Sequence, residues 1–520
     1  MNKRNQILIL LSLLAGVAAL QYFGIMRQGF IFHDEGYLFL RAEIIKKFFQ
    51  DQPVALTQYA GYTDSKILWL GFVMLAQVLF HGHLFSAHFL SLAFGLISIL
   101  MTGYLAKKYY NSPQTGFLSA CCFALLPSFF FYSRLALPET AGMVLTLGCL
   151  ICYVSRHKGN VVLAGILAAC AFLTNRYRVM MLPFFILILE WGWLRKARNQ
   201  SHLQSLKSFL LFCIITAVSV AIYPVIVYIF RNFQIVLPAY LKGFHQSLAS
   251  HALPSFHWQA FRVYTYYIYE FEGLAVLLLL GVGALFIRAP SSTWIPLCFV
   301  LLQIFGSAWV DEQVPRNLSI VLPFIAMVIA LTFQNIYGYL KDSRTGRILF
   351  FLFCLACTAS LMEKTLKVVT AKTDLLNVAA GVQQIYPQGQ VITTNPSYRV
   401  YNPAAQLIFP FQNNGRKYAP EDFTQDNPAV FIFDPQAQIL HKYHKIYNWD
   451  NNYAAFVDGL AGHCPIVLFY ENFNPYYRKR FIFEQVKVAP FEFAKLFDEE
   501  SFYEFGQILV FDLSRCQTAK

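Results

Sequence analysis

The sequence predicts an α-helical polytopic membrane protein with about 11 spans and a C-terminal soluble α/β domain. Hydrophobic residues make up 57% of the 520 residues, and only 13% are charged, roughly half the charged share of an average soluble domain. Apolar runs close to the length that crosses a bilayer, about 17–25 residues, recur up to about residue 370. Beyond that point, Pro, Asn, Gln and charged residues occur at soluble frequencies. The chain is therefore expected to have a membrane part followed by a water-exposed part.

The predicted spans are charge-poor apolar runs. They cover residues 7–24, 86–106, 114–131, 138–154, 160–174, 179–194, 208–230, 273–287, 292–310, 317–338 and 348–362. A further run, 67–81, is amphiphilic and contains Gln77. If it does not cross, the basic clusters between the later runs all lie in the cytoplasm, whereas a crossing would place each of them outside, against the positive-inside rule. We therefore expect an interfacial or re-entrant helix at 67–81, on the outer surface.

This topology also explains the net charge of +13. Basic residues clustered between apolar runs set membrane orientation, so no nucleic-acid partner is expected. The N-terminus is predicted in the cytoplasm of a cell inner or plasma membrane. The odd number of spans places the C-terminal domain outside the cytoplasm.

Two domains are expected, 1–370 in the membrane, with outer loops 25–85 and 231–272, and 371–520 outside. In the second domain, short apolar strands at 391–393, 429–433, 466–470 and 508–511 alternate with helical stretches, which is typical of a small α/β fold. Cys464 and Cys516 lie in this domain and can form a disulfide if it is exported.

The first outer loop opens with two adjacent acids, Asp34 and Glu35. Such acids are costly near lipid unless they are hydrated or paired. In one interpretation Asp34 caps a helix at 36–49 and Glu35 adds favourable charge to its first turn. In the other, the carboxylates act as a base or bind a metal at the membrane surface. The two interpretations are compatible.

Cations on the predicted outer face form a second group of candidates. Arginine suits bidentate phosphate contacts, so arginines placed outside against the positive-inside tendency suggest an anionic ligand, although pairing with outer acids is the competing explanation. Arg134 and Glu139 flank a proline-broken turn, where a salt bridge sealing the turn is the alternative. Lys66 is either a snorkelling anchor or a phosphate contact. The remaining candidates are Arg176, Arg178 and Arg316.

A later outer loop, 231–272, contains His245, His251 and His257, followed by Trp258 and several tyrosines. The aromatic residues are first of all interfacial anchors. The histidines lack the tight spacing of a zinc site. Nucleotide-binding motifs are missing from the sequence, and the spans contain almost no charge. Nucleotide-driven transport and proton-coupled transport are therefore both disfavoured.

The order of these features resembles the GT-C glycosyltransferase superfamily, in the branch of protein O-mannosyltransferases and lipid A aminoarabinose transferases. The resemblance covers about residues 1–340. It rests on the Asp-Glu-Gly-x-Tyr opening of the first loop, the Lys-led interfacial helix, the Arg-x-Ala-x-Pro-acid loop, the His/aromatic loop, and an Arg before a late span. It implies transfer of a sugar from a polyprenyl-phosphate donor, outside the cytoplasm, to a lipid, glycan or protein acceptor in the cell envelope.

The resemblance also implies residue roles. Asp34 becomes the leading candidate for the base, supported by Glu35, and Glu139 takes the place of the second-loop acid. Contacts to the donor phosphate are implied for Lys66, Arg134, Arg176, Arg178 and Arg316, and contacts to the substrate for His245 and Tyr62. The sequence departs from the family pattern at two places that bear on the acceptor geometry. Ile67-Leu68 stands where the family usually has Pro-Pro, and Glu139 stands where it usually has Asp.

Other functions and cofactors stay open at this point. A divalent metal would also neutralise the phosphate, and the sequence does not decide whether one is used. A transporter or flippase of lipid-linked glycans is an alternative. So is a non-catalytic membrane assembly factor whose C-terminal domain binds a partner.

Overall fold

The computed structural model describes most of the chain. The described residues are 3–30, 33–49, 66–155, 157–175, 178–196, 202–230, 258–288, 292–309, 314–370, 375–387, 389–393, 395–407, 429–434, 460–471, 483 and 507–516. They group into two compact units. Unit 1 is Met1–Tyr22, Lys47–Ala76 and His88–Val369, and unit 2 is Phe23–Lys46, Gln77–Ala87 and Thr370–Lys520. Unit 2 thus combines the C-terminal part with two segments of the predicted membrane domain.

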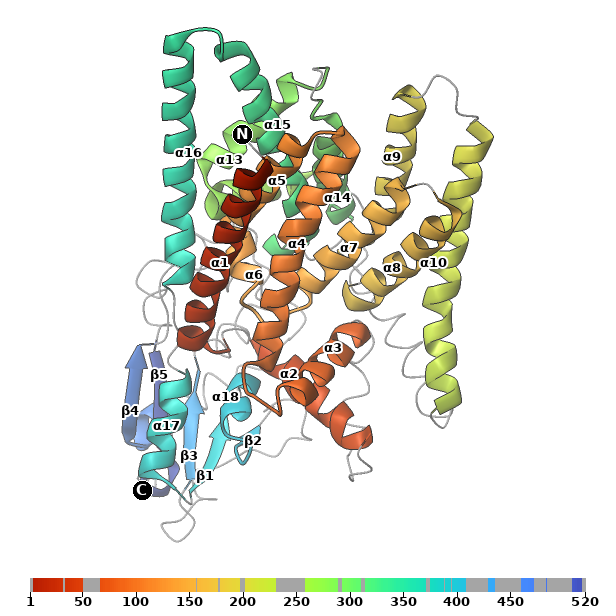
Figure 1. Cartoon of the computed structure of the whole chain (residues 1–520). Coiled ribbons are helices and arrows are strands. Elements are labelled where there is room, and N and C mark those ends of the chain that lie inside the picture. The colour runs from red at the N-terminus through yellow and green to blue at the C-terminus, as the bar shows by residue number, and fades with distance from the viewer. Residues whose placement is uncertain are drawn as a thin grey trace. The chain divides into compact units, whose positions relative to one another are not determined.

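The N-terminal two thirds of the chain are helical (Figure 1). The helices are α1 (Lys3–Gln28), α2 (His33–Phe49), α3 (Ile67–Leu79), α4 (Ser86–Tyr110), α5 (Pro113–Ala124), α6 (Pro127–Tyr132), α7 (Glu139–Val154), α8 (Lys158–Asn175), α9 (Leu182–Lys196), α10 (His202–Phe230), α12 (Gln259–Tyr267), η3 (Ile268–Glu272), α13 (Leu274–Leu285), α14 (Trp294–Ser307), η4 (Pro315–Val321), α15 (Leu322–Leu340) and α16 (Arg344–Val369).

Six of these helical stretches are long and apolar enough to cross a membrane among the described residues. They are Arg4–Arg27, Ser86–Tyr110, Lys158–Asn175, Ser205–Ile222, Pro315–Leu340 and Arg344–Val369. The other predicted spans are shorter apolar helices. The protein is therefore a multi-pass membrane protein, and its helical fold class is confirmed.

Two predicted runs differ from a simple span. The run 114–131 is broken into α5 and α6, because Pro127 has no N–H to continue a helix and instead begins the next one. The run 67–81 forms α3, which has 13 residues. At about 1.5 Å per residue this is roughly 20 Å, less than the hydrocarbon thickness of about 30 Å. The length of α3 agrees with a helix that does not cross the membrane. Its location at the membrane interface stays a prediction.

Close helix packing in unit 1 depends on small residues. Helix α8 packs between α7 and α10, as Figure 1 shows. A methyl group at Gly165 of α8 would come within 2.8 Å of Ile215 in α10. Likewise, a methyl group at Gly103 of α4 would come within 2.9 Å of the Gly116 carbonyl of α5. Close approach at small residues is how helices associate where lipid provides no hydrophobic drive between them.

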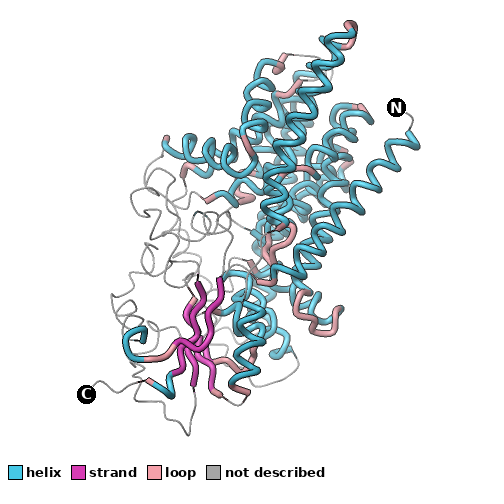
Figure 2. Tube along the Cα trace, turned by 90° about the vertical axis from the view of Figure 1, so that its left-hand side faces the viewer, coloured by secondary structure: helices cyan, strands magenta, loops and turns pink. Residues whose placement is uncertain are grey.

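The C-terminal part of unit 2 is built on one five-stranded sheet (Figure 2). Its strands are β1 (Gln390–Thr393), β2 (Gln406–Leu407), β3 (Ala429–Phe433), β4 (Ile466–Glu471) and β5 (Gln507–Asp512), in the order β2-β1-β3-β5-β4. The first three strands are parallel, and β5 runs antiparallel to both β3 and β4. The four predicted strands are confirmed, and the two-residue β2 was not predicted.

Both faces of this sheet are covered. Alternate residues of a strand point to opposite faces. Val430 and Ile432 accordingly join the apolar face of α17 (Leu375–Ile385), whereas Phe431 and Phe433 join a second core that contains Leu460. Helix α18 (Pro396–Tyr401) follows β1 directly and contributes Tyr398 to the first core.

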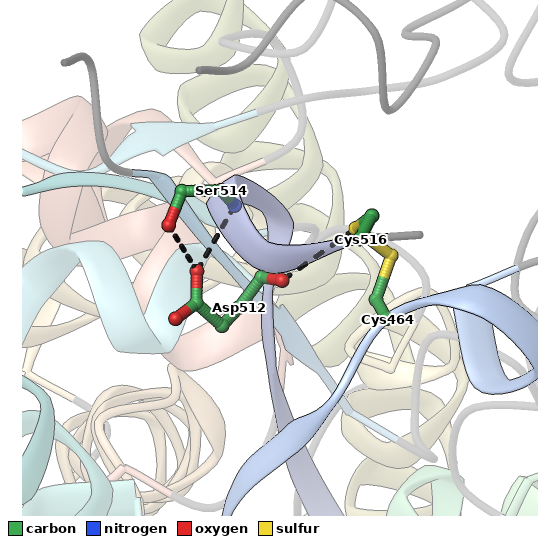
Figure 3. The surroundings of a disulfide bond; sticks show 4 residues. All are labelled: Cys464, Asp512, Ser514 and Cys516. Atoms are coloured by element: carbon green, nitrogen blue, oxygen red, sulfur yellow. Dashed lines mark hydrogen bonds between the residues drawn. A yellow bond between two sulfur atoms is a disulfide. The ribbon is translucent and has the colours of Figure 1, made fainter. Parts of the chain in front are cut away.

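Cys464 and Cys516 form a disulfide across 52 residues of sequence (Figure 3). The bond joins the segment before β4 to the turn after β5. That turn is capped by Asp512, whose Oδ1 accepts hydrogen bonds from the N–H and the hydroxyl of Ser514 at 2.9 and 2.5 Å. The pairing considered from the sequence is therefore present in the structure.

Candidate functional site

A buried ion pair lies at the start of α7. The Nη1 group of Arg178 donates a hydrogen bond to Oε1 of Glu139. The side chains of Arg178 and Glu139 are 8% and 0% exposed. Glu139 is the first residue of α7, directly after Pro138, so its carboxylate also faces the positive end of the helix dipole. The buried carboxylate of Glu139 thus has two favourable electrostatic contacts.

Three elements meet beside this pair. One turn after Glu139, a methyl group at Gly142 would lie 3.3 Å from Ile320 of η4 and 3.7 Å from Cβ of Asn175, the last residue of α8. The same η4 contains Arg316, which is buried. Pro315 begins η4 and fixes the direction in which the chain enters it. The start of α7, the end of α8 and η4 therefore bring acidic, amide and guanidinium groups into one buried region.

A hydrogen-bonded network extends this region away from α7. The side-chain amide of Asn317 donates to the hydroxyl of Tyr264 at 2.9 Å. The amide of Gln303 donates to the Asn317 carbonyl at 3.0 Å. Helices α12 and α14 are thereby tied to η4. The two amides were not singled out in the sequence, because an Asn or Gln in an apolar run carries no motif, and Tyr264 was read there only as one of the interfacial aromatic residues.

Several buried polar atoms of this region have no hydrogen-bond partner within the described part of the chain. They are Oε2 of Glu139, Oγ1 of Thr140, Nδ2 of Asn175 and Oγ of Ser319. Leaving such a group unpaired costs about 1–3 kcal/mol, and nearly all buried polar groups in proteins find a partner. All four atoms belong to residues of α7, η4 or the end of α8, the three elements that meet beside Gly142.

Arg134 has a structural role. Its guanidinium donates to the backbone carbonyls of Val368 and Val369, to the latter at 3.3 Å. These are the last residues of α16, where carbonyls lack partners within the helix, and a cation there also complements the helix dipole. The proposed salt bridge between Arg134 and Glu139 is wrong, since Glu139 pairs with Arg178. The contact of Arg134 with the donor phosphate stays a prediction.

The first-loop acids belong to unit 2. Helix α2 begins at His33, three residues before the predicted helix 36–49, so Asp34 and Glu35 lie inside its first turn. The expectation that Asp34 is the N-cap is therefore wrong, whereas the acidic first turn is confirmed. Glu35 is fully buried and Asp34 is partly exposed. Lys66 is partly exposed and lies immediately before α3.

The other candidates lie outside the described residues. These are Tyr62, Arg176, His245, His251 and His257, and their roles stay predictions. Within the described ranges there is no group of three or more His, Cys, Asp or Glu side chains that would hold a metal ion. In the region around α7, the positive charge opposite Glu139 comes from Arg178.

Comparison with solved structures bears on the fold. The chain is similar to ArnT from Cupriavidus metallidurans bound to undecaprenyl phosphate, with a TM-score of 0.58 and 12% identity over 98% of both chains. It is also similar to the Archaeoglobus fulgidus oligosaccharyltransferase in its apo form, with a TM-score of 0.52 and 11% identity over 84% of this chain and 70% of that one. The chain has the GT-C fold.

A sequence comparison agrees with this GT-C fold. Residues 68–234 match the family model of dolichyl-phosphate-mannose-protein mannosyltransferases. No curated protein sequence matches the chain. The resemblance to GT-C glycosyltransferases that the loop motifs indicated is thereby confirmed, and α4, α7 and α8 lie within the matched segment.

Proposed function

We propose that this GT-C protein is an integral-membrane glycosyltransferase that moves a sugar from a polyprenyl-phosphate-linked donor to an acceptor outside the cytoplasm. The observation that carries the proposal is the buried Glu139–Arg178 pair, with Arg316 on the adjoining η4, in a chain of this fold. Undecaprenyl phosphate bound to the similar ArnT supports a donor of that chemical class. The acceptor is a lipid, a glycan or a protein.

The proposed reaction assigns roles to a few charged side chains. Asp34 accepts the proton of the acceptor hydroxyl, and the acceptor oxygen forms a bond to the anomeric carbon of the sugar. The bond between that carbon and the phosphate oxygen breaks, and polyprenyl phosphate leaves with the electron pair. Arg178 and Arg316 stabilise the negative charge on the leaving phosphate, as guanidinium groups do in buried sites. Lys66 and Arg176 are further cations proposed for the phosphate.

Glu139 has a different proposed role from Asp34. Its Oε1 orients Arg178, and its Oε2 has no hydrogen-bond partner among the described residues. We infer that Oε2 accepts a hydrogen bond from the bound substrate. Hydrogen bonds to carboxylate oxygens are about twice as strong as those between neutral groups.

The proposal is tested by donor consumption. Purified protein in phospholipid nanodiscs is incubated with a panel of undecaprenyl-phosphate-linked sugars and envelope lipid acceptors, and mass spectrometry measures the undecaprenyl phosphate released. We expect release with one donor class, abolished by Asp34→Asn and retained by Asp342→Asn, an exposed acid between α15 and α16. Turnover by Asp34→Asn at the wild-type rate would exclude this base. Lipid translocation in vesicles without a covalent product would favour the flippase instead.

A further inference from the structure

Helix α18 of the C-terminal part packs directly on the segment that leads into α2, within unit 2 (Figure 1). Gly36 touches the backbone of Ser397 so closely that a methyl group there would come within 2.4 Å of its N and Cα atoms. Gly29 has a φ of +63° and faces Tyr401, where a methyl group would come within 2.1 Å of the hydroxyl. Two glycines, one on each side of Asp34 in sequence, thus permit this contact.

Tyr401 makes a specific bond across this contact. Its hydroxyl oxygen accepts a hydrogen bond from the backbone N–H of Phe30 at 2.6 Å. Its ring meets the Phe30 ring edge-to-face, with centroids 5.8 Å apart. Burial raises the pKa of Tyr401, and the neighbouring Glu35 carboxylate raises it further. The hydroxyl therefore stays protonated, and the chain four residues before Asp34 is fixed by a side chain from the C-terminal part.

The sheet in turn fixes α18. Asn395 caps the helix, because its Oδ1 accepts from the Ser397 N–H at 2.8 Å. The amide nitrogen of the same Asn395 donates to Asp434, which directly follows β3. Both Asn395 and Asp434 are buried. A continuous set of hydrogen bonds therefore runs from the ends of β1 and β3, through the cap of α18, to Tyr401 and the start of α2.

We propose that Tyr401 is a positioning residue for Asp34, so that the C-terminal sheet holds the base of the proposed transfer in its reactive orientation. The inference rests on the proposed function for the identity of the base. A carboxylate in the first turn of a helix moves with the chain that enters that helix, and small displacements of a catalytic group are costly. Loss of the Tyr401 hydroxyl should therefore change the rate of the chemical step rather than the binding of the donor.

The main experiment compares Tyr401→Phe with Tyr398→Phe in the full-length protein. Each substitution removes one hydroxyl from the same helix, but Tyr398 packs in the core of the sheet. We expect Tyr401→Phe to lower kcat for sugar transfer about tenfold, with the KM for the donor unchanged. Tyr398→Phe should leave kcat within twofold. Equal loss of kcat in both variants would overturn the proposal, because weaker packing of the C-terminal part would then explain it.

A second pair of variants approaches the contact from α2. Gly36→Ala places a methyl group against the Ser397 backbone, whereas Gly71→Ala in α3 has nothing within 4 Å of the added carbon. We expect kcat to fall in Gly36→Ala and to be retained in Gly71→Ala. A wild-type kcat in Gly36→Ala would count against the proposal.

Hydrogen–deuterium exchange separates this inference from the proposed function. The Phe30 amide should exchange roughly five- to tenfold faster in Tyr401→Phe, the loss expected for one hydrogen bond, and at the wild-type rate in Tyr398→Phe. If wild-type protein consumes no donor, the proposed function fails while the exchange result still reports the contact. If wild-type protein is active and Tyr401→Phe matches it in kcat, the positioning role is refuted.

Discussion

The Glu139–Arg178 pair gives the sharpest test of whether the buried region serves catalysis or only stability. Both side chains are at least nine-tenths buried. Removing one partner leaves an unpaired buried charge, which costs about 3–5 kcal/mol. Replacing both removes the charges together and is often close to neutral. Glu139→Gln and Arg178→Met should each destabilise the protein by that amount, and the double variant should recover most of the loss.

The coupling free energy follows from unfolding in detergent micelles, measured for the four proteins of the cycle. We expect the double variant to be at least about 2 kcal/mol more stable than the sum of the two single effects predicts. Sugar transfer should not recover with it, because the double variant lacks both the cation for the phosphate and the free carboxylate oxygen. A double variant that is stable and transfers sugar at the wild-type rate would refute the catalytic role of the pair.

Three further predictions concern stability. In the double variant Cys464→Ser/Cys516→Ser, the free energy of unfolding of the C-terminal part should fall by about 4 kcal/mol, the value expected when a loop of 52 residues is no longer closed. Proteolysis of this part should become faster, and an unchanged cleavage rate would contradict the prediction. In Arg134→Lys, the single ammonium group cannot replace the planar guanidinium that donates to two carbonyls, so the melting temperature should fall while sugar transfer per folded molecule is retained. A loss of transfer without a loss of stability would instead support a contact between Arg134 and the donor phosphate. Burial raises the pKa of Tyr386 and of Tyr398 to about 12 each. In Tyr386, the hydrogen bond that its hydroxyl donates to Asp512 also raises the pKa. Because the unfolded chain releases these protons near pH 10 and the folded chain does not, stability should fall between pH 10 and 12, and chemical unfolding of Tyr386→Phe across that range should show a smaller fall.

Most of the fold was predictable from local patterns. Long apolar runs identify the helices. In β3, Val430 and Ile432 face one core and Phe431 faces the other, so all three residues are apolar and the strand is recognisable as a short apolar run. The break at Pro127 was not predicted, since 114–131 was expected as one continuous span. The start of α2 at His33 was predicted three residues too late, because helix ends depend on capping contacts made in the folded chain. The two-residue β2 is too short to leave any pattern in the sequence.

The candidate site was less predictable. Outward arginines pointed to Arg178 and Arg316, and both are buried in the structure, Arg178 against Glu139 and Arg316 on η4. The sequence did not indicate which acid pairs with which cation, since Arg134 is close to Glu139 along the chain whereas its actual partner Arg178 is 39 residues away. Nor did it indicate Asn317 or Tyr401, because their roles depend on partners 53 and 371 residues away, Tyr264 for Asn317 and Phe30 for Tyr401.

The bond between Phe30 and Tyr401 also affects how the protein matures. The two residues are 371 positions apart, and β5, which lies between β3 and β4, ends only at Asp512. At synthesis rates of about 5–20 residues per second, the start of α2 waits roughly half a minute to a minute and a half for the sheet that supports α18. A nascent chain that stalls before β5 therefore has no completed sheet to hold Tyr401 against Phe30, so this contact forms late in the maturation of the protein.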